Sequence, residues 1–547
     1  MPLRKIVIGE SGRSLWILMG AVCFVLLIAC SNIAGLLLAR TATRSGELAM
    51  RAALGAGRVR LIRQLLVEGC VLSLVGGTAG LALAWWGVGV LRGFIPNALP
   101  RVADVHVDGT VLIFTLGLSL VTGVIFGILP ALWTSRIDLS RTIKECKRSQ
   151  GMGGRKSRFL STLVVVQFAL ALVLVNGEAL MLKSLWNATG VRELGAPEKV
   201  LIAGLSLDGP RYEEDASKER FLDQLFDRLR GLPGVESVGA STRLPLSSGW
   251  TSGVLVEGED FDADIQRPMT WMVCASGDYF DALGISLDRG RTLRAEDGEE
   301  GAMNIVVNRT FAEHYWPGEN PLGKGVRGNW EPPWFEGTVV GVVENVRQSG
   351  LESPVERELY MPFFPSFMPE WWLVIRTAGD PSASTSAVRR ELAAIDPELP
   401  LSSVFTGEEL YDTAAGNRRF STLLLGLFAA VSVFLIAAGA YGVLTFEVVR
   451  RRHEIGVRTA LGADADSIVR LVLSRGLRLA LIGVAIGLAG ATVSAQLLGS
   501  LLYQVGPLHP VSLGLAAGFL VLIGLIASIV PALKAASVDP VRVLQSE

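Results

Sequence analysis

The sequence predicts a polytopic α-helical membrane protein that carries one large α+β domain outside the membrane. Three observations lead to this prediction. Half of the 547 residues are apolar and only 19% are charged, which is far from the balance of an average soluble protein. The apolar residues gather in long runs on both sides of one polar block, residues 185–415. A ten-residue motif occurs twice, once on each side of that block.

The apolar runs have the length of membrane-spanning helices, since about 20 residues at a rise of 1.5 Å cross a hydrocarbon core about 30 Å thick. Seven runs meet this requirement, at about 15–38, 70–91, 110–133, 159–182, 420–445, 479–502 and 511–533. Buried helices of a large soluble core are the alternative, but such helices rarely repeat this length seven times. We therefore expect about seven transmembrane helices.

The repeated motif is Glu47–Ala56, which returns as Glu454–Ala463 with six of its ten positions identical. Each copy follows a long apolar run. The register continues without a gap at an offset of 407 residues, through Arg63/Arg470, Leu66/Leu473, Gly69/Gly476, Gly76/Gly483 and Gly80/Gly487. The chain therefore contains a duplicated three-helix membrane unit, with an outward-facing hairpin between its second and third helices.

The distribution of basic residues predicts the orientation. Arg and Lys gather around both copies of the motif and before the fourth span, whereas the links 92–109 and 503–510 hold only Arg92 and Arg101. Basic loops stay in the cytoplasm, so both motif copies are expected inside and the polar block outside. Counting spans then leaves the basic residues 1–14 outside with no signal peptide before them, and we expect a segment to be missing upstream.

The expected organisation follows from these boundaries. It comprises a remnant outer segment (1–14), a first three-helix unit (15–135), a basic cytoplasmic linker (136–158), a further transmembrane helix (159–184), the outer domain (185–415) and a second three-helix unit (416–547). In the outer domain, periodicity predicts a strand at Val200–Leu207, a helix at Lys218–Leu229 and a strand at Val235–Ser241. Further strands are expected at 254–257, 268–274, 304–307, 338–343 and 372–376, and a helix near 384–394. Mixed elements joined by Pro/Gly turns favour two small lobes over a β-sandwich.

No catalytic, cofactor-binding or metal site is predicted. Gly318–Gly325 approaches a phosphate-binding loop, but Gly325 stands where Ser or Thr is needed and Pro321 interrupts the segment. His453 begins like a metalloprotease pair, yet Val457 replaces the second histidine. The four histidines are scattered, the five cysteines show no CxxC spacing, and no Ser/His/Asp arrangement can be argued.

The duplicated cytoplasmic segment is the candidate functional site. In each copy, a Glu and an Arg four residues apart share one face of a short amphipathic helix, and a Leu and a Gly follow at its end. The candidate residues are Glu47, Arg51, Leu54 and Gly55, and Glu454, Arg458, Leu461 and Gly462. One interpretation is an interfacial helix that only anchors its neighbours. Retention of the same residue types in both copies favours docking of a pseudo-symmetric or dimeric cytoplasmic partner.

Small residues recur at helix-packing spacing inside the duplicated unit. Gly76 and Gly80 in the first copy correspond to Gly483 and Gly487 in the second. Glycines four apart let two helix backbones approach closely within a membrane. We expect these four residues at the interface between the two three-helix units.

These residues allow a resemblance to be stated. Glu454–Ala463 resembles the signature of FtsX-like/MacB-like ABC transporter permeases, in the acidobacterial-type duplicated arrangement. The outer block is similar to a MacB-like periplasmic core domain, notably in Asp278–Ile285, Asn308–Ala312 and Val339–Val343. The chain differs in one respect, because its first half lacks the helix and the periplasmic domain with which each half of such a permease begins.

The resemblance implies a non-catalytic permease subunit in the bacterial inner membrane, with its large domain in the periplasm. It implies that a separate cytoplasmic ABC ATPase binds the repeated motif and that ATP-driven motion is passed to the periplasmic domain, a mechanism called mechanotransmission. Export or efflux of an antibiotic, peptide or lipoprotein is the implied outcome. No cofactor is expected on this chain. Beyond the ATPase and the lipid bilayer, a second permease copy and an outer-envelope adaptor are the implied partners, and nucleic acid is not one.

Three other functions remain open at this point. A regulator of cell-envelope enzymes of the FtsX kind fits the same resemblance. A secondary transporter predicts charged or broken helices near the bilayer midplane, and the spans here are nearly free of charge. A membrane-anchored outer enzyme or sensor requires a catalytic cluster that the sequence does not display.

Overall fold

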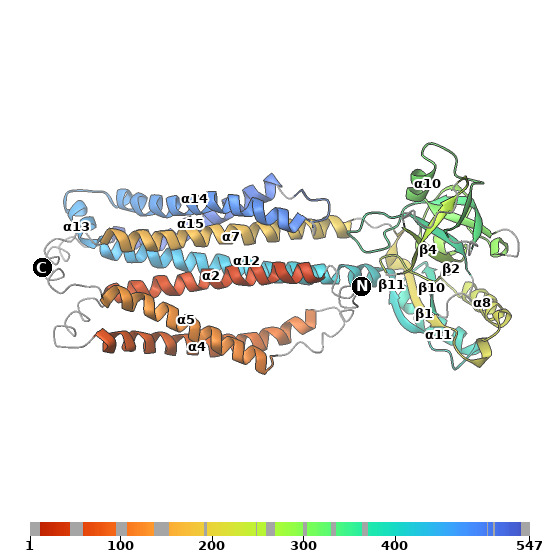
Figure 1. Cartoon of the computed structure of the whole chain (residues 1–547), viewed down its shortest axis with the longest axis horizontal. Helices are drawn as coiled ribbons and strands as arrows, with labels where there is room; N and C mark the ends of the chain where they lie inside the picture. Colours follow the sequence, from red (N-terminus) through yellow and green to blue (C-terminus); the bar gives the residue numbers. More distant parts are fainter. Residues whose placement is uncertain are drawn as a thin grey trace. The chain divides into compact units, whose positions relative to one another are not determined.

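The structure is a computed structural model that describes residues 11–43, 58–94, 107–135, 153–190, 194–247, 249–258, 269–298, 303–329, 335–363, 370–499, 502–506 and 509–537. Its internal contacts divide the chain into two compact units. The first unit contains Met1–Trp186 and Arg418–Glu547, and the second contains residues 187–417. Figure 1 shows the first unit as a set of long helices and the second as a sheet with shorter helices.

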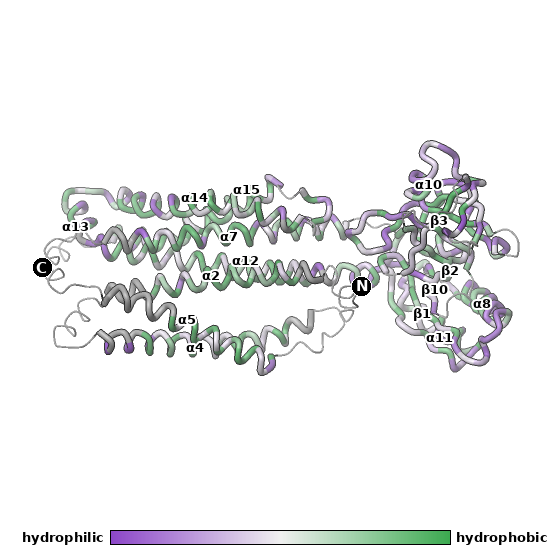
Figure 2. The backbone as a smooth tube through the Cα atoms, in the orientation of Figure 1, coloured by the Kyte–Doolittle hydropathy of each residue, from purple (hydrophilic) through white to green (hydrophobic). Residues whose placement is uncertain are grey.

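Long apolar helices make up the first unit, and two of them, α7 and α12, include residues beyond its boundaries at Trp186 and Arg418. They are α2 (Ser11–Thr43), α4 (Arg58–Phe94), α5 (Gly109–Ser135), α7 (Gly153–Gly190), α12 (Gly407–Arg450), α14 (Ala465–Leu498) and α15 (Pro510–Ala536), with the short α13 (Arg452–Ala460) between α12 and α14. Six of the long helices are long and apolar enough to cross a membrane. The seventh predicted span, 110–133, lies in α5, whose side chains are described only as far as Val124. Figure 2 shows how apolar these helices are along their length.

The packing of the first unit centres on α7, which is the most buried of the described spans. A single cluster of buried side chains joins α7 to α2, α12, α14 and α15; it includes Ile28, Phe168, Leu172, Ile436 and Leu520. At the start of α15, the His509 side chain accepts a hydrogen bond from the backbone N–H of Ser512, and Pro510 occupies the first turn. The sequence thus marks where this helix begins.

The second unit is built on one hydrogen-bonded sheet. Its described strands are β1 (Val200–Ser206), β2 (Val235–Ser241), β3 (Thr251–Val256), β4 (Met269–Ala275), β5 (Leu287–Gly290), β6 (Met303–Asn308), β7 (Gly325–Gly328), β8 (Glu336–Val343), β9 (Glu358–Pro362), β10 (Glu370–Thr377) and β11 (Ser402–Thr406). The order is β11-β1-β10-β2-β4-β3-β7-β8-β6-β9, with β5 beside β8 and an additional β4–β9 pairing. Strands β2 and β4 meet through one residue pair, Ser241 with Ala275. The two predicted lobes are therefore two parts of one sheet.

Four helices complete the second unit, namely α8 (Asp215–Arg230), α9 (Tyr279–Leu283), α10 (Arg309–Tyr315) and α11 (Pro381–Ile395), together with 3-10 turns at Pro197–Lys199, Pro210–Tyr212 and Ala295–Gly298. Side chains of α8 and α11 form one apolar core with β1, β2 and β10. The Asn308 side chain caps α10, and Asp380 followed by Pro381 caps α11. The predicted strands and both predicted helices are confirmed.

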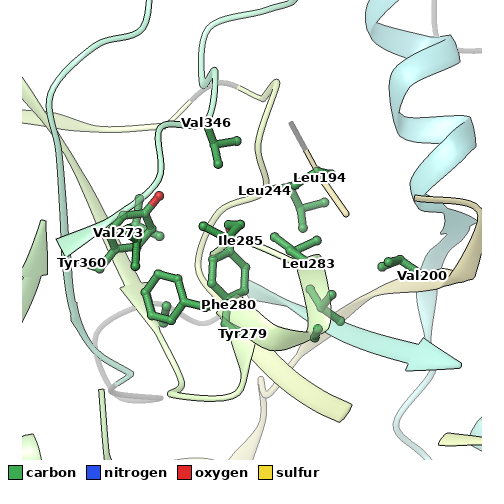
Figure 3. Packing of buried hydrophobic residues seen from close by; sticks show 14 of the residues in the cluster. Leu194, Val200, Leu244, Val273, Tyr279, Phe280, Leu283, Ile285, Val346 and Tyr360 are labelled. Carbon is green, nitrogen blue, oxygen red and sulfur yellow. The ribbon is translucent and has the colours of Figure 1, made fainter. Parts of the chain in front are cut away.

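Aromatic side chains fill the core around α9 (Figure 3). Tyr279, Phe280 and Tyr360 are fully buried, and the Phe280 and Tyr360 rings meet edge to face with centroids 5.0 Å apart. Helix α9 can lie this close to β2 because position 239 is glycine. A Cβ atom there would stand 2.5 Å from the Tyr279 Cα and 2.6 Å from its backbone nitrogen.

A buried carboxylate stabilises the turn after β5. Asp297 is 1% exposed and accepts hydrogen bonds from both Arg291 Nη atoms (2.6 and 2.7 Å), the Arg294 backbone N–H (2.7 Å) and Asn304 Nδ2 (2.7 Å). Burial alone raises the pKa of this carboxyl, but the hydrogen bonds and the Arg291 charge outweigh it and lower the pKa to about 2. The charged form is therefore part of the fold.

Candidate functional site

The second copy of the motif forms α13 and the turn that follows it. The helix buries Ile455 against Ile468 and Val472 of α14 and against Ala532 and Ala535 of α15. This apolar contact holds one face of α13 against its own membrane unit. The opposite face is left for solvent or a partner.

Gly462 ends α13 in a Schellman turn. Its backbone N–H donates to the Thr459 carbonyl (3.0 Å), and the Ala463 N–H donates to the Arg458 carbonyl (3.0 Å). Gly462 has a φ of 92°, in the left-handed region where a Cβ atom causes strain. The residue is glycine because the turn requires this conformation.

The exposed face of α13 carries Glu454, Val457 and Arg458, and Leu461 follows at the end of the helix. Arg458 Nη2 donates to Glu454 Oε1 at 2.8 Å, the ion pair expected from the four-residue spacing. Leu461 is 82% exposed. An exposed pair of this kind stabilises a helix by only about 0.2–0.5 kcal/mol, so stability is a weak reason to keep it in two copies.

The first copy of the repeated motif lies in a part of the chain that the structure does not describe. Glu47, Arg51, Leu54 and Gly55 lie outside the described residues. The description resumes at Arg58, where α4 begins. Their role therefore remains a prediction from the repeat.

The four packing glycines behave differently from the expectation. A Cβ at Gly483 would lie 2.4 Å from Phe168 Cβ, and one at Gly487 would lie 2.9 Å from the Ala169 carbonyl oxygen, so both glycines face α7. No described atom lies within 4 Å of a Cβ built on Gly76 or Gly80. Gly483 and Gly487 therefore face α7 and not the first three-helix unit, whereas the expected place of Gly76 and Gly80 at the interface stays a prediction. In the second copy α7 occupies the groove, because its bulky Phe168 fits the space that the glycines leave.

Contacts within each three-helix unit use a different glycine that the sequence did not single out. Gly123 of α5 packs on Ser73 of α4, and Gly524 of α15 packs on Ala480 of α14. These are equivalent positions, because the offset between the copies is 407 residues at the second helix and 401 at the third. Applying both offsets to every small residue of the sequence would have identified this contact.

A polar cluster inside the membrane joins the first copy to the second. Gln167 Nε2 donates to Asn32 Oδ1 (3.0 Å), and Asn32 Nδ2 donates to the Leu435 carbonyl (2.6 Å), which links α7, α2 and α12. Gly439 leaves room for both amides. The two amides line an otherwise mostly apolar cavity of about 510 Å³. Asn32 was missed because one polar residue in a long apolar run gives no periodic signal.

The sequence predicts neither a phosphate-binding loop at Gly318–Gly325 nor a metal site, and the structure bears on both. Gly325 opens strand β7 and helix α10 precedes the Gly318–Gly325 segment, which is the reverse of the strand-then-helix order that a phosphate-binding loop requires. Lys324 is paired with Glu319 at 3.1 Å. Within the described part of the chain, no group of three or more His, Cys, Asp or Glu side chains could hold a metal ion.

Comparison with known families identifies both kinds of domain. The family model of the FtsX-like permease C-terminal domain matches residues 19–139 and 426–540. The model of the MacB-like periplasmic core domain matches residues 188–395. The two FtsX-like matches cover the two copies of the duplicated unit.

Individual proteins of ABC transporters are similar to parts of this chain. The chain is 24% identical over 345 residues to an uncharacterized ABC transporter permease, YknZ, of Bacillus subtilis, covering 61% of this chain and 81% of that protein. It is 28% identical over 300 residues to the macrolide export ATP-binding/permease protein MacB of Azoarcus sp., covering 52% of this chain but only 44% of MacB. The crystallised periplasmic region of MacB from Actinobacillus actinomycetemcomitans aligns over 41% of this chain and 94% of its own, at 16% identity and a TM-score of 0.27.

Proposed function

Because the chain belongs to the FtsX-like permeases that carry a MacB-like periplasmic core domain, we propose that it is the non-catalytic membrane subunit of an ABC-type transporter driven by a separate ATPase. The chain is a multi-pass protein of the inner membrane. Since α12 crosses the membrane once after the core domain, α13 lies on the cytoplasmic side, where ATP is available. The exposed face of α13 is the observation that carries the proposal.

The ATPase docks on this face. An exposed leucine flanked by Arg458 and Glu454 provides an apolar anchor with a charged rim, the arrangement that protein interfaces favour. Arg451 and Arg452 are exposed next to it, so the partner surface carries acidic groups. Glu47–Ala56 presents the same residue types to the second ATPase subunit of a pseudo-symmetric pair.

Motion of α13 is passed to the periplasmic side through α12. This helix is 44 residues long, from Gly407 to Arg450, which corresponds to about 66 Å at 1.5 Å per residue. A helix of this length without a break transmits a displacement of one end to the other. The transported compound then need not pass between the helices, and the periplasmic core domain performs the mechanical work of export.

The substrate belongs to the classes handled by such permeases, namely an antibiotic, a peptide or a lipoprotein. The MacB relative is named for macrolide export, which supports efflux of an amphipathic compound. Regulation of a cell-envelope enzyme uses the same coupling from α13 to the core domain and differs only in the periplasmic partner. A secondary transporter is less well supported, because the polar cluster of Asn32 and Gln167 consists of neutral amides and the described ion pair Glu447–Arg475 lies near the α13 end of its helices.

The test uses the tagged full chain purified from its own host in mild detergent. We expect an ABC ATPase to co-purify with vanadate-sensitive ATP hydrolysis. Leu461→Asp removes the anchor, and Arg51→Glu with Arg458→Glu reverses the charge in both copies. Loss of an anchor worth about 2 kcal/mol weakens binding about thirtyfold.

Arg389→Glu is the matched control, because it makes the same charge change on an exposed position of periplasmic helix α11. It should leave ATPase recovery and activity unchanged. Recovery of the ATPase that is equal in wild type, Leu461→Asp and the double charge reversal would refute docking on the repeated motif.

A further inference from the structure

An ion pair lies beside α13, between a buried carboxylate of α12 and a partly exposed arginine of α14, the two helices that flank α13. Glu447 of α12 is 6% exposed, and both of its carboxylate oxygens accept hydrogen bonds from the Arg475 guanidinium of α14, one from Nε and one from Nη2. This two-point contact fixes the orientation of both side chains as well as their separation. It therefore ties the end of α12 to α14 at a defined angle.

The pair is connected directly to the start of α13. The Glu447 carbonyl accepts a hydrogen bond from the Arg451 backbone N–H (2.9 Å), and the Arg451 carbonyl accepts one from Ile455 N–H (2.9 Å). Residues 447 and 475 are 28 positions apart, and the whole of α13 and its Schellman turn lie between them. The ion pair thus closes the base of the loop that presents α13.

The sequence repeat has residues of exchanged charge at the positions that correspond to this pair. At the offset of 407 residues that aligns the two motifs, Glu447 corresponds to Arg40 and Arg475 corresponds to Glu68. Arg40 belongs to α2 and Glu68 to α4, the helices that flank the first motif copy as α12 and α14 flank the second. The side chain of Arg40 is outside those described, and Glu68 is exposed and accepts a hydrogen bond from Gln64 Nε2 (3.4 Å), so this correspondence rests on the register alone.

The exchange is specific to these positions. Over the thirty aligned positions from Arg40 to Gly69 and from Glu447 to Gly476, an acid replaces a base or a base replaces an acid at two places only. These two places correspond to Glu447 and Arg475. In the second copy, either change alone would set like charges against each other, whereas the register of the repeat exchanges both charges together.

We infer that Glu447–Arg475 is a positioning pair that holds α13 in place, and that Arg40–Glu68 is its charge-reversed counterpart for the first motif copy. The pair does not itself touch the ATPase. The importance of this pair for transport rests on the proposed function, because α13 matters to transport only if the ATPase docks there.

The first experiment reads the position of α13 without any ATPase. A nitroxide label is attached at Leu461→Cys in a cysteine-free background of the full chain, reconstituted in nanodiscs. Glu447→Arg and Arg475→Glu should each at least double the mobile fraction of the spectrum. The exchanged variant, Glu447→Arg with Arg475→Glu, should return to the parent spectrum, because the first copy already uses that order of charges.

Arg478→Glu is the matched control, since it reverses an exposed charge on the same helix one turn further along. It should leave the label as immobile as in the parent. Single variants with a parent-like spectrum would overturn the inference. The inference would also be overturned if the label in the exchanged variant were as mobile as in the single variants. Rescue by the second reversal is expected only if the two charges interact, and not if each single change simply unfolds the protein.

The second experiment separates this inference from the proposed function. ATP hydrolysis by the co-purified ATPase should fall at least tenfold in each single variant and recover in the exchanged variant. If no ATPase co-purifies with any form but the label responds as described, docking fails and the positioning pair stands. If the ATPase binds and works normally in the single variants, the positioning pair fails and docking stands.

Discussion

The clearest prediction of the packing concerns two glycines that are equivalent in the repeat but have different surroundings. Gly483→Ala would place a Cβ 2.4 Å from Phe168 Cβ and 2.8 Å from the Val165 carbonyl oxygen. Gly76→Ala, 407 residues earlier, would meet no described atom within 4 Å. The same chemical change is therefore a steric clash in one copy and harmless in the other.

The magnitude follows from two opposing contributions. Alanine is better than glycine inside a helix by about 0.8–1.0 kcal/mol, and this gain applies equally at both positions. Overpacking of a tight contact costs about 1–3 kcal/mol, and it applies only at Gly483. Comparing the two variants cancels the helix propensity, so Gly483→Ala should be less stable than Gly76→Ala by about 1–3 kcal/mol.

Unfolding of the full chain by SDS in mixed micelles, followed by circular dichroism, measures this difference. Gly487→Ala and Gly80→Ala form a second matched pair with the same expectation, because a Cβ at Gly487 would lie 3.0 Å from the Ala169 Cα. Equal stability within both pairs of variants would refute close packing of α14 on α7.

Three further predictions concern the periplasmic core domain in the full chain. The pKa of Asp297 is lowered from an ordinary 3.8 to about 2, so its carboxylate stabilises the fold above pH 4 and this contribution is lost as the pH falls from about 4 to 2. Asp297→Asn should cost about 2 kcal/mol at pH 7, and its urea-unfolding free energy should lose the pH dependence that the wild type shows in this window. Gly239→Ala should destabilise the domain by about 1–3 kcal/mol, because the Tyr279 backbone cannot move away, and Gly379→Ala is a control with no described atom within 4 Å. Cys274 is 1% exposed and burial raises its pKa to about 12, so a polar maleimide at pH 8 should label it only after unfolding; labelling of the native protein would contradict its place in the core.

Several features were predictable because they depend on local chemistry. The strand Val235–Ser241 was predicted with the bounds that the structure gives, since it combines alternating residues with a Pro-Gly turn before it. The short strands β5 and β7 were missed, because four residues carry too little periodicity to be recognised. Strand β9 is buried along its whole length and begins with Glu358, so it lacks the alternation that marks a strand with one wet face.

In the candidate site, too, local features were predictable from the sequence and long-range contacts were not. The pairing of Glu454 with Arg458 and the turn at Gly462 follow from spacing along a single helix. The partner of Glu447 was not evident, because Arg475 is 28 residues away and basic residues are common throughout the region. The partner of Gly483 was predicted wrongly, because small residues show that a helix can be approached closely but do not specify which helix approaches.

The order of residues along the chain was sufficient to predict six membrane-spanning helices that the structure supports, the duplication, the repeated motif and the kind of domain outside the membrane, since hydropathy, spacing and turn chemistry act over short distances. The three-dimensional arrangement alone decided that α7 fills the groove at Gly483 and that Asn32 meets Gln167. It also decided that Glu447 and Arg475 close the loop carrying α13. These contacts join residues far apart in sequence, and they depend on which helix faces which once all of the apolar surfaces compete for the same neighbours.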